Sequence, residues 1–174
     1  FGYIIRIIEK LLKFWTRGDS YSAIKGRAQV KSKDLESLIL DNPIKFTKDE
    51  LVYGDLLINK LNLPSDCQFI CIHNRDNLHL NQTHPGRDWS YHDYRNYSIK
   101  SLELAAEQFA KSNYYVVRVG SQAKEKLITR NPKIIDYTHS GIRSDFLDIY
   151  LAFKSKAYFG SDSGIADSFK IFGK

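Results

Sequence analysis

The chain has 174 residues, and 43% of them are hydrophobic, which is enough for one domain with its own core. No stretch approaches the roughly 20 consecutive apolar residues of a membrane-spanning helix. The formal net charge of +6 lies wholly in residues 1–33, where eight Lys and Arg stand against two acidic residues. The rest of the chain is neutral overall, which argues against a nucleic-acid-binding role for it.

The N-terminal part predicts a helical arm and a linker. The sequence begins with Phe1 and contains no Met, so we expect an internal piece of a longer protein in which residues 1–46 are the remnant of another domain. Residues 3–15 predict a helix that is apolar except for a stripe of charged side chains. We expect it either to pack against a part of the protein outside this chain or to lie on an anionic membrane surface. Residues 16–46 are polar and contain Gly and Pro, which is typical of a linker.

Residues 47–174 predict a second unit in which helices and strands alternate. The capping box Thr47-Lys-Asp-Glu50 predicts a helix that ends near Asn62. Short strands, each continuously apolar, and amphipathic helices follow it. Strands of this kind between helices are typical of an α/β domain with a parallel sheet and helices on both faces. The strands are predicted at residues 68–73, 114–120, 134–137 and 157–159, and the helices at 98–112, 144–154 and from 165 onward.

The ends of these strands carry the candidate binding residues, because ligands of parallel sheets bind at the carboxyl ends of the strands. Every strand is followed by a polar or charged cluster. The clusters contain three arginines that could offset the charge of phosphates. The candidates after the first three strands are Arg75, Arg118, Gly120, Ser121 and Arg143.

The loop Gly160–Gly164 after the fourth strand is the most distinctive of these clusters. A small-residue loop that leads into a helix leaves backbone N–H groups unpaired, and the helix dipole makes them a site for a phosphate or diphosphate. Ser161 and Ser163 could add hydroxyl donors, and Asp162 suits the hydroxyl groups of a sugar or ribose. The alternative is an ordinary strand-to-helix turn in which Asp or Ser caps the helix.

Residues 74–97 predict a long segment without periodicity. Loops longer than about 15 residues are usually functional or disordered, and the aromatic residues here argue against disorder. Four of the five histidines lie between residues 73 and 92, but their spacing matches no recognised metal site, so we expect no metal. Stacking on a sugar or a base suits the composition better. The candidates for acceptor binding or a lid are Trp89, Tyr94, Arg95 and Asn96.

Several of these pieces together resemble a bacterial family of glycosyltransferases found with cell-surface polysaccharide and lipopolysaccharide synthesis. The loop Phe159-Gly-Ser-Asp-Ser-Gly164 looks like the Asp-Ser/Thr-Gly loop of two-domain, heptosyltransferase-like enzymes of the GT-B fold. The resemblance covers about residues 50 to 174 and implies that they form the Rossmann-like, C-terminal half of such an enzyme, which holds a nucleotide-sugar donor without a metal or other cofactor. The other matching pieces are His73–Asp76, Asp93–Asn96, Tyr115–Ser121, Ile135–Ser140 and Arg143–Tyr150.

The expected function is therefore transfer of a sugar from a nucleotide sugar to a glycan or lipid-linked acceptor. Asp76 is the candidate general base, unless it forms a salt bridge with Arg75 or Arg95. The donor-binding residues would be those after the strands together with the loop through Gly164. Cys67 and Cys71 would lie about 13 Å apart on a strand, which is too far for a disulfide between them. Free cysteines suit the reducing cytoplasm, so we expect a cytoplasmic protein. Residues 1–33 could attach it peripherally to the inner face of the cell membrane.

Two other hypotheses stay open. The second unit could be a non-catalytic nucleotide- or sugar-binding module of a surface-assembly protein. Residues 1–33 could instead be an RNA-binding arm attached to an unrelated domain.

Overall fold

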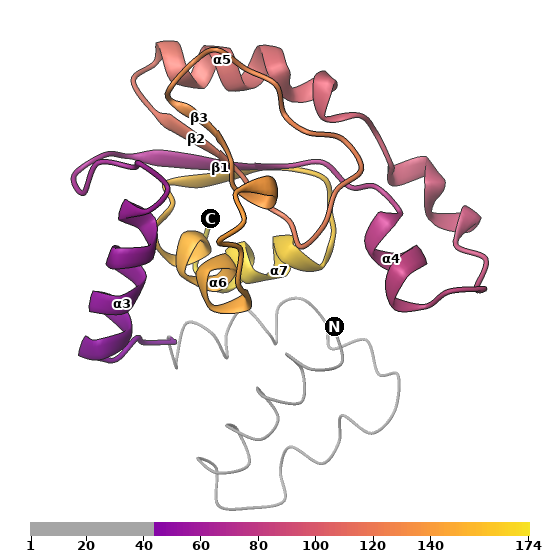
Figure 1. Ribbon diagram of the computed structural model, residues 1–174, viewed down its shortest axis with the longest axis horizontal. Helices are drawn as coiled ribbons and strands as arrows, with labels where there is room; N and C mark the ends of the chain where they lie inside the picture. Colours follow the sequence, from indigo (N-terminus) through magenta and orange to yellow (C-terminus); the bar gives the residue numbers. More distant parts are fainter. Residues whose placement is uncertain (1–43) are drawn as a thin grey trace, which may run out of the picture. The chain divides into compact units, whose positions relative to one another are not determined.

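The computed structural model describes residues 44–174, which form one compact unit. The predictions made for the arm, including its membrane-binding and RNA-binding alternatives, lie outside the described residues. The described helices and strands alternate along the chain, as the sequence predicts (Figure 1). In order they are α3 (Lys48–Asn59), β1 (Phe69–His73), α4 (Leu78–Thr83), η2 (Ser90–Arg95), η3 (Ile99–Leu102), α5 (Glu103–Lys111), β2 (Tyr115–Arg118), β3 (Ile134–Asp136), η4 (Tyr137–His139), α6 (Asp145–Lys154), β4 (Ala157–Gly160) and α7 (Gly164–Ile171).

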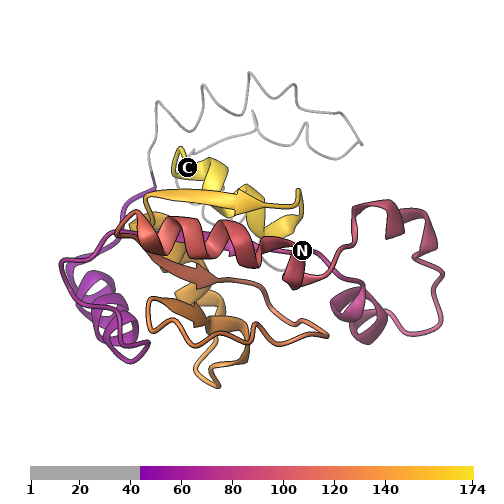
Figure 2. The same ribbon diagram turned by 90° about the horizontal axis from the view of Figure 1, so that it is seen from above.

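The four strands form one parallel sheet in the order β3-β2-β1-β4, with helices on both faces (Figures 1 and 2). Successive side chains of a strand point to opposite faces. In β1, Phe69 and Cys71 therefore join the core beneath α3, α6 and α7, whereas Ile70 and Ile72 join the core beneath η3 and α5. Both faces of the central strand are buried, so its sequence is continuously apolar. The predicted Rossmann-like α/β fold is confirmed.

The first described helix shows how a local sequence signal and a long-range contact combine. Thr47 and Glu50 form the predicted capping box, in which the carboxylate of Glu50 accepts from the Thr47 N–H at 2.7 Å. The helix ends at Asn59, three residues before the predicted end. Gly54 lets α3 approach α6 closely, because a Cβ added there would lie 2.4 Å from the ring of Tyr150.

Three details differ from the predictions. The run at residues 157–159 was expected to be a buried strand, but β4 is an edge strand of the described sheet, and Phe159 is 45% exposed. An apolar run does not reveal where in the sheet a strand will lie. Residues 74–97 are not a loop without structure, because they contain α4 and η2. The helix expected over residues 98–112 begins with the 3-10 turn η3 before α5.

The part of the chain that the structure describes contains no helix that could span a membrane. None of the helices within residues 44–174 combines the length and the apolar character that a bilayer requires.

Candidate functional site

The strand order places a topological switch point between β1 and β4. The chain moves outward from β1 to β2 and β3, and then returns to the other side of β1 to form β4. His73 at the end of β1 is paired in register with Gly160 at the end of β4. In open parallel sheets a ligand-binding crevice forms where two neighbouring strands send their chains in opposite directions. This edge of the sheet, which we call the rim, is therefore the candidate site.

Gly160 is required for the close approach of the two strands at the rim. A Cβ at this position would lie 2.1 Å from the carbonyl oxygen of His73, which is far inside van der Waals contact. The same oxygen accepts hydrogen bonds from the Ser161 N–H at 3.1 Å and from the hydroxyl of Tyr97 at 3.0 Å. The loop after β4 thus begins directly beside the end of β1.

The loop after β4 leads into α7 as predicted, and its side chains leave the start of that helix free. Ser163 is the N-cap residue, yet its side chain makes no capping hydrogen bond. Asp162 pairs with Lys170 at 3.1 Å instead of capping the helix. The alternative of a helix capped by an Asp or Ser side chain is therefore wrong. The hydroxyl oxygens of Ser161 and Ser163 are buried and have no hydrogen-bond partner among the described residues, so their hydrogen-bonding capacity beside the start of α7 is unused.

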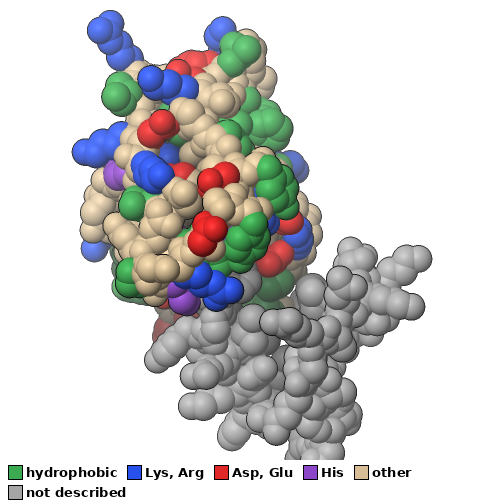
Figure 3. Space-filling view, turned by 90° about the vertical axis from the view of Figure 1, so that its right-hand side faces the viewer, with side chains coloured by type: hydrophobic (Ala, Val, Ile, Leu, Met, Phe, Trp, Pro, Cys, Tyr) green, Lys and Arg blue, Asp and Glu red, His purple; other side chains and the backbone are tan. Residues whose placement is uncertain are grey.

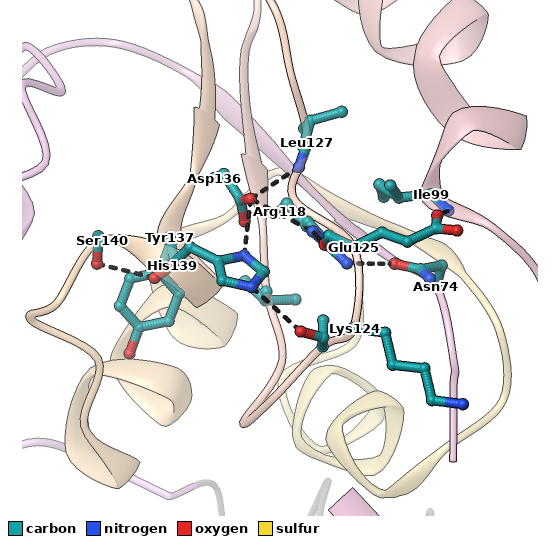
Figure 4. Close-up of polar contacts among 12 residues, drawn as sticks. Asn74, Ile99, Arg118, Lys124, Glu125, Leu127, Asp136, Tyr137, His139 and Ser140 are labelled. Carbon is teal, nitrogen blue, oxygen red and sulfur yellow. Dashed lines mark hydrogen bonds and ion pairs between the residues drawn. The ribbon is translucent and has the colours of Figure 1, made fainter. Parts of the chain in front are cut away.

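Arg118 is buried at the rim and joins segments that are distant in the sequence. Its side chain is 1% exposed, and its guanidinium donates to the Asn74 Oδ1 at 2.9 Å and to the carbonyl oxygen of Glu125 at 2.5 Å (Figure 4). It also forms an ion pair with Asp136 at 3.3 Å. The geometry leaves Arg118 no exposed surface for a phosphate, and the predicted donor-binding role does not match this position.

The other two predicted phosphate-binding arginines are also engaged within the protein. Arg75 is 8% exposed and donates to the carbonyl oxygen of His92 at 3.2 Å and to the side-chain oxygen of Asn96. It thereby ties the segment after α4 to the end of β1. Arg143, at 28% side-chain exposure, pairs with Asp148 at 2.5 Å and with Asp145 at 2.6 Å. Burial nevertheless raises the pKa of the Asp148 carboxyl, so desolvation outweighs the attraction of Arg143.

Asp136 connects Arg118 to the segment that follows β2. Its Oδ2 accepts from the Leu127 N–H at 2.9 Å and lies 2.9 Å from the Nδ1 of His139. The Nε2 of His139 in turn lies 3.1 Å from the carbonyl oxygen of Ala123 (Figure 4). The sequence places Asp136 and His139 after a strand, but the network depends on residues that are distant along the chain.

Asp76, the predicted general base, anchors backbone on both sides of it. Its Oδ1 accepts from the Leu78 N–H at 2.9 Å and its Oδ2 from the Lys124 N–H at 2.8 Å. Among the ion pairs of residues 44–174, none joins Asp76 to Arg75 or Arg95, so the salt-bridge alternative is wrong. Each carboxylate oxygen keeps a further lone pair, and the role of Asp76 as a base stays a prediction.

Two histidines that were not singled out for the site lie at the rim. The Nδ1 of His73 is 2.9 Å from the carbonyl oxygen of Val119, beside Gly120. The Nδ1 of His79 is 3.1 Å from the hydroxyl of Ser121. Burial lowers the pKa of both imidazoles, which favours their neutral forms. The position of His73 as the last residue of a strand is a sequence signal that could have indicated it.

The four residues predicted to bind the acceptor or form a lid lie on one segment, residues 84–96, which projects from the end of β1 (Figure 1). The guanidinium of Arg87 lies 4.4 Å from the centroid of the Trp89 ring, and the imidazole of His92 is stacked with the same ring. Tyr94 is 83% exposed and lies next to Arg95. Asn96 connects this segment to Arg75. Figure 3 views the molecule from this side and shows apolar, basic and acidic side chains interspersed. Exposed aromatic rings beside cations suit stacking on a sugar or a base.

Comparison of the chain with protein families, curated proteins and solved structures gives no match. Within residues 44–174, no group of three or more His, Cys, Asp or Glu side chains is placed to hold a metal ion.

Proposed function

We propose that residues 44–174 bind a nucleoside-diphosphate sugar at the rim and are the donor-binding half of a GT-B glycosyltransferase. The observation that carries this proposal is the loop Ser161–Gly164, which opens α7 at the topological switch point. The backbone N–H groups of residues 162–164, the helix dipole and two hydroxyls without partners among the described residues would form a cradle for a diphosphate. The resemblance described above extends the proposal to sugar transfer onto a glycan or lipid-linked acceptor of the cell surface, without a metal.

The neighbouring residues have separate roles in this proposal. Asp162 is exposed beside the loop, and its carboxylate would accept hydrogen bonds from sugar hydroxyls. Ser121 lies in the segment after β2, and its hydroxyl would donate a hydrogen bond to the nucleotide sugar. Residues 84–96 would cover the bound ligand through their aromatic rings. Arg75 donates to neutral acceptors and would act through the positive potential that it adds to the rim. Arg118 and Arg143 form ion pairs with carboxylates and would instead hold the rim in shape.

A non-catalytic binding module is the second candidate, and one observation favours it. All three arginines that could stabilise a departing diphosphate are engaged by protein acceptors in this structure. Catalysis of glycosyl transfer needs stabilisation of the charge that grows on the leaving group. A module that only binds a nucleotide sugar needs no such group, so binding without turnover would support this candidate.

Calorimetry with a panel of nucleotide sugars, with and without a chelator, tests the proposal. We expect binding that the chelator leaves unchanged and that Gly164→Val abolishes, because a side chain there would occupy the start of α7. Asp162→Asn should weaken nucleotide-sugar binding by about 1–2 kcal/mol, since a charged acceptor is stronger than a neutral one. It should leave the free nucleoside diphosphate bound equally or slightly more tightly.

Asp167→Asn is a matched control for Asp162→Asn. Both carboxylates pair with Lys170 at 3.1 Å, so each substitution removes one charge and the same kind of ion pair. Asp167 lies within α7 rather than in the loop, and its substitution should leave both affinities unchanged. Equal losses for both ligands in Asp162→Asn, together with a lower melting temperature, would show that the loop is structural and would contradict the site assignment. Binding that the chelator abolishes would contradict the metal-free donor site.

A further inference from the structure

His73 occupies the centre of the rim. It is the last residue of β1, the strand that lies between β2 and β4 in the sheet. Its backbone is paired with Gly160, where the donor loop begins. Its ring lies against Gly120, where an added Cβ would be 3.3 Å from the Nδ1 of His73 and 3.5 Å from the hydroxyl oxygen of Thr138. Gly120 has a φ of 147°, which glycine adopts readily, so the chain after β2 makes room for this imidazole.

The hydrogen bond of His73 fixes which ring nitrogen carries the proton. The Nδ1 lies 2.9 Å from the carbonyl oxygen of Val119, and a carbonyl oxygen can only accept. The Nδ1 must therefore carry the hydrogen, which leaves the lone pair of a neutral imidazole on Nε2. The Nε2 makes no hydrogen bond with any described residue, and His73 is the one residue of β1 that is only partly buried.

The surroundings keep this imidazole neutral near physiological pH. Burial is the main cause that lowers its pKa, and the charges of Arg118 and Arg75 act in the same direction. The hydrogen bond to Val119 and the charge of Asp76 act against them without reversing the shift. A neutral, oriented imidazole whose Nε2 has no hydrogen-bond partner among the described residues is a proton acceptor in its reactive form.

We infer that His73, rather than Asp76, is the general base of the proposed transfer, and this inference rests on the proposed function of the rim. Asp76 uses both carboxylate oxygens to hold backbone N–H groups, whereas the Nε2 of His73 has no partner among the described residues. His73 also lies beside the strand end from which the donor loop starts, so the proton acceptor and the diphosphate cradle adjoin each other.

The step is a direct displacement with inversion at the anomeric carbon. The acceptor oxygen forms a bond to that carbon while its proton passes to the Nε2 of His73. The bond from the anomeric carbon to the diphosphate oxygen breaks, and its electron pair leaves on the nucleoside diphosphate. The imidazolium keeps its Nδ1 hydrogen bond to Val119 and returns the Nε2 proton to solvent. Water can take the place of the acceptor, which gives hydrolysis of the donor.

The substitutions His73→Asn and His73→Gln separate catalysis from positioning. The amide nitrogen of Asn stands close to the place of Nδ1 and can keep the hydrogen bond to Val119, but Asn has no group at Nε2. Gln reaches the place of Nε2 and loses the Nδ1 donor. The experiment uses the nucleotide sugar that binds most tightly in the calorimetric panel, with water as acceptor, and measures affinity, release of nucleoside diphosphate, the anomer of the released sugar and its pH profile.

We expect His73→Asn to keep the donor affinity within about threefold and to lower the rate of release by about 100-fold or more. The wild-type rate should fall at acidic pH, and this fall should be absent in His73→Asn. The wild type should release the sugar first as the inverted anomer. A long-range proton–nitrogen spectrum of the wild type should show hydrogen on Nδ1 and none on Nε2 at pH 7.

Four results would overturn the inference. The first is a rate in His73→Asn equal to that of the wild type, and the second is release of sugar with retained configuration. The third is a loss of rate in His73→Gln but not in His73→Asn, accompanied by a lower stability of the Gln variant. That result would show that the ring only stabilises β2 through its hydrogen bond to Val119. The fourth is an Nε2–H tautomer. If the wild type binds no nucleotide sugar, the proposed function itself fails, and calorimetry distinguishes this outcome from the others.

Discussion

Replacement of Arg118 by Met tests whether the buried network supports the rim. Met has similar length and no charge, and Arg118 is only 1% exposed. The variant would leave the Asn74 Oδ1 and the Glu125 carbonyl oxygen without their donor and would remove the guanidinium from Asp136, whose side chain is 13% exposed. Removing one partner of a buried ion pair costs about 3–5 kcal/mol. His139 still faces Asp136, so we expect a loss near the lower end, about 3 kcal/mol.

That loss is a large fraction of the roughly 5–15 kcal/mol by which domains of this size are stable. Urea unfolding should show it as a midpoint lower by about 1–3 M, given slopes of about 1–3 kcal/mol per molar. A loss below about 1 kcal/mol would refute the reasoning. The double variant Arg118→Met with Asp136→Asn removes the charge that Arg118 neutralises. In that background Arg118→Met should cost clearly less, and strict additivity would show that the ion pair is not the cause.

Two further predictions concern stability. Gly54→Ala should destabilise the protein by about 1–3 kcal/mol in urea unfolding, because the new Cβ would meet the buried ring of Tyr150 at 2.4 Å. The destabilisation is expected although Ala favours helices over Gly by about 1 kcal/mol. An unchanged or higher midpoint would contradict the close contact. The pKa values of His73 and His79 are lowered in the folded state, so the unfolded chain binds more protons than the folded chain at mildly acidic pH. The free energy of unfolding that the two neutral imidazoles contribute is therefore fully present above about pH 6.5 and is lost as the pH falls below it. Unfolding midpoints at pH 7.5 and 5.5 should differ less for His73→Asn than for the wild type, and an equal difference would contradict the contribution of His73.

The fold could be predicted from the sequence because its signals are local. Continuous apolar runs marked β1 to β4, and helical periodicity with a capping box marked the main helices. The order of the strands could not be predicted in this way, since it depends on which strands pair. This is why β4 was expected to be buried although it lies at an edge of the described sheet. The helix α4 was missed because six residues hold too few apolar positions to show a period.

The gathering of the candidate residues could be predicted as well, because the carboxyl ends of parallel strands share one edge of the sheet. The partners of its side chains could not. Arg118 donates to Asn74, 44 residues away, and Arg75 donates to Asn96, 21 residues away. An arginine after a strand has the same sequence signal whether it binds a ligand or holds backbone. The tautomer of His73 likewise depends on Val119, 46 residues further along the chain.

The rim thus divides into a supporting side and a side that carries the proposed donor loop. On the supporting side, Asp76, Arg118, Asp136 and His139 are joined to one another or to the backbone of residues 123–127, and this keeps the ends of β1 to β3 in place. On the other side, the loop into α7 contains two hydroxyls without partners among the described residues, and the start of α7 has no side-chain cap. Donors that are held in place before a ligand arrives stabilise charge without rearranging. Substitutions on the first side should therefore lower stability and affinity together, whereas substitutions in the loop should change affinity while the unfolding midpoint stays close to that of the wild type.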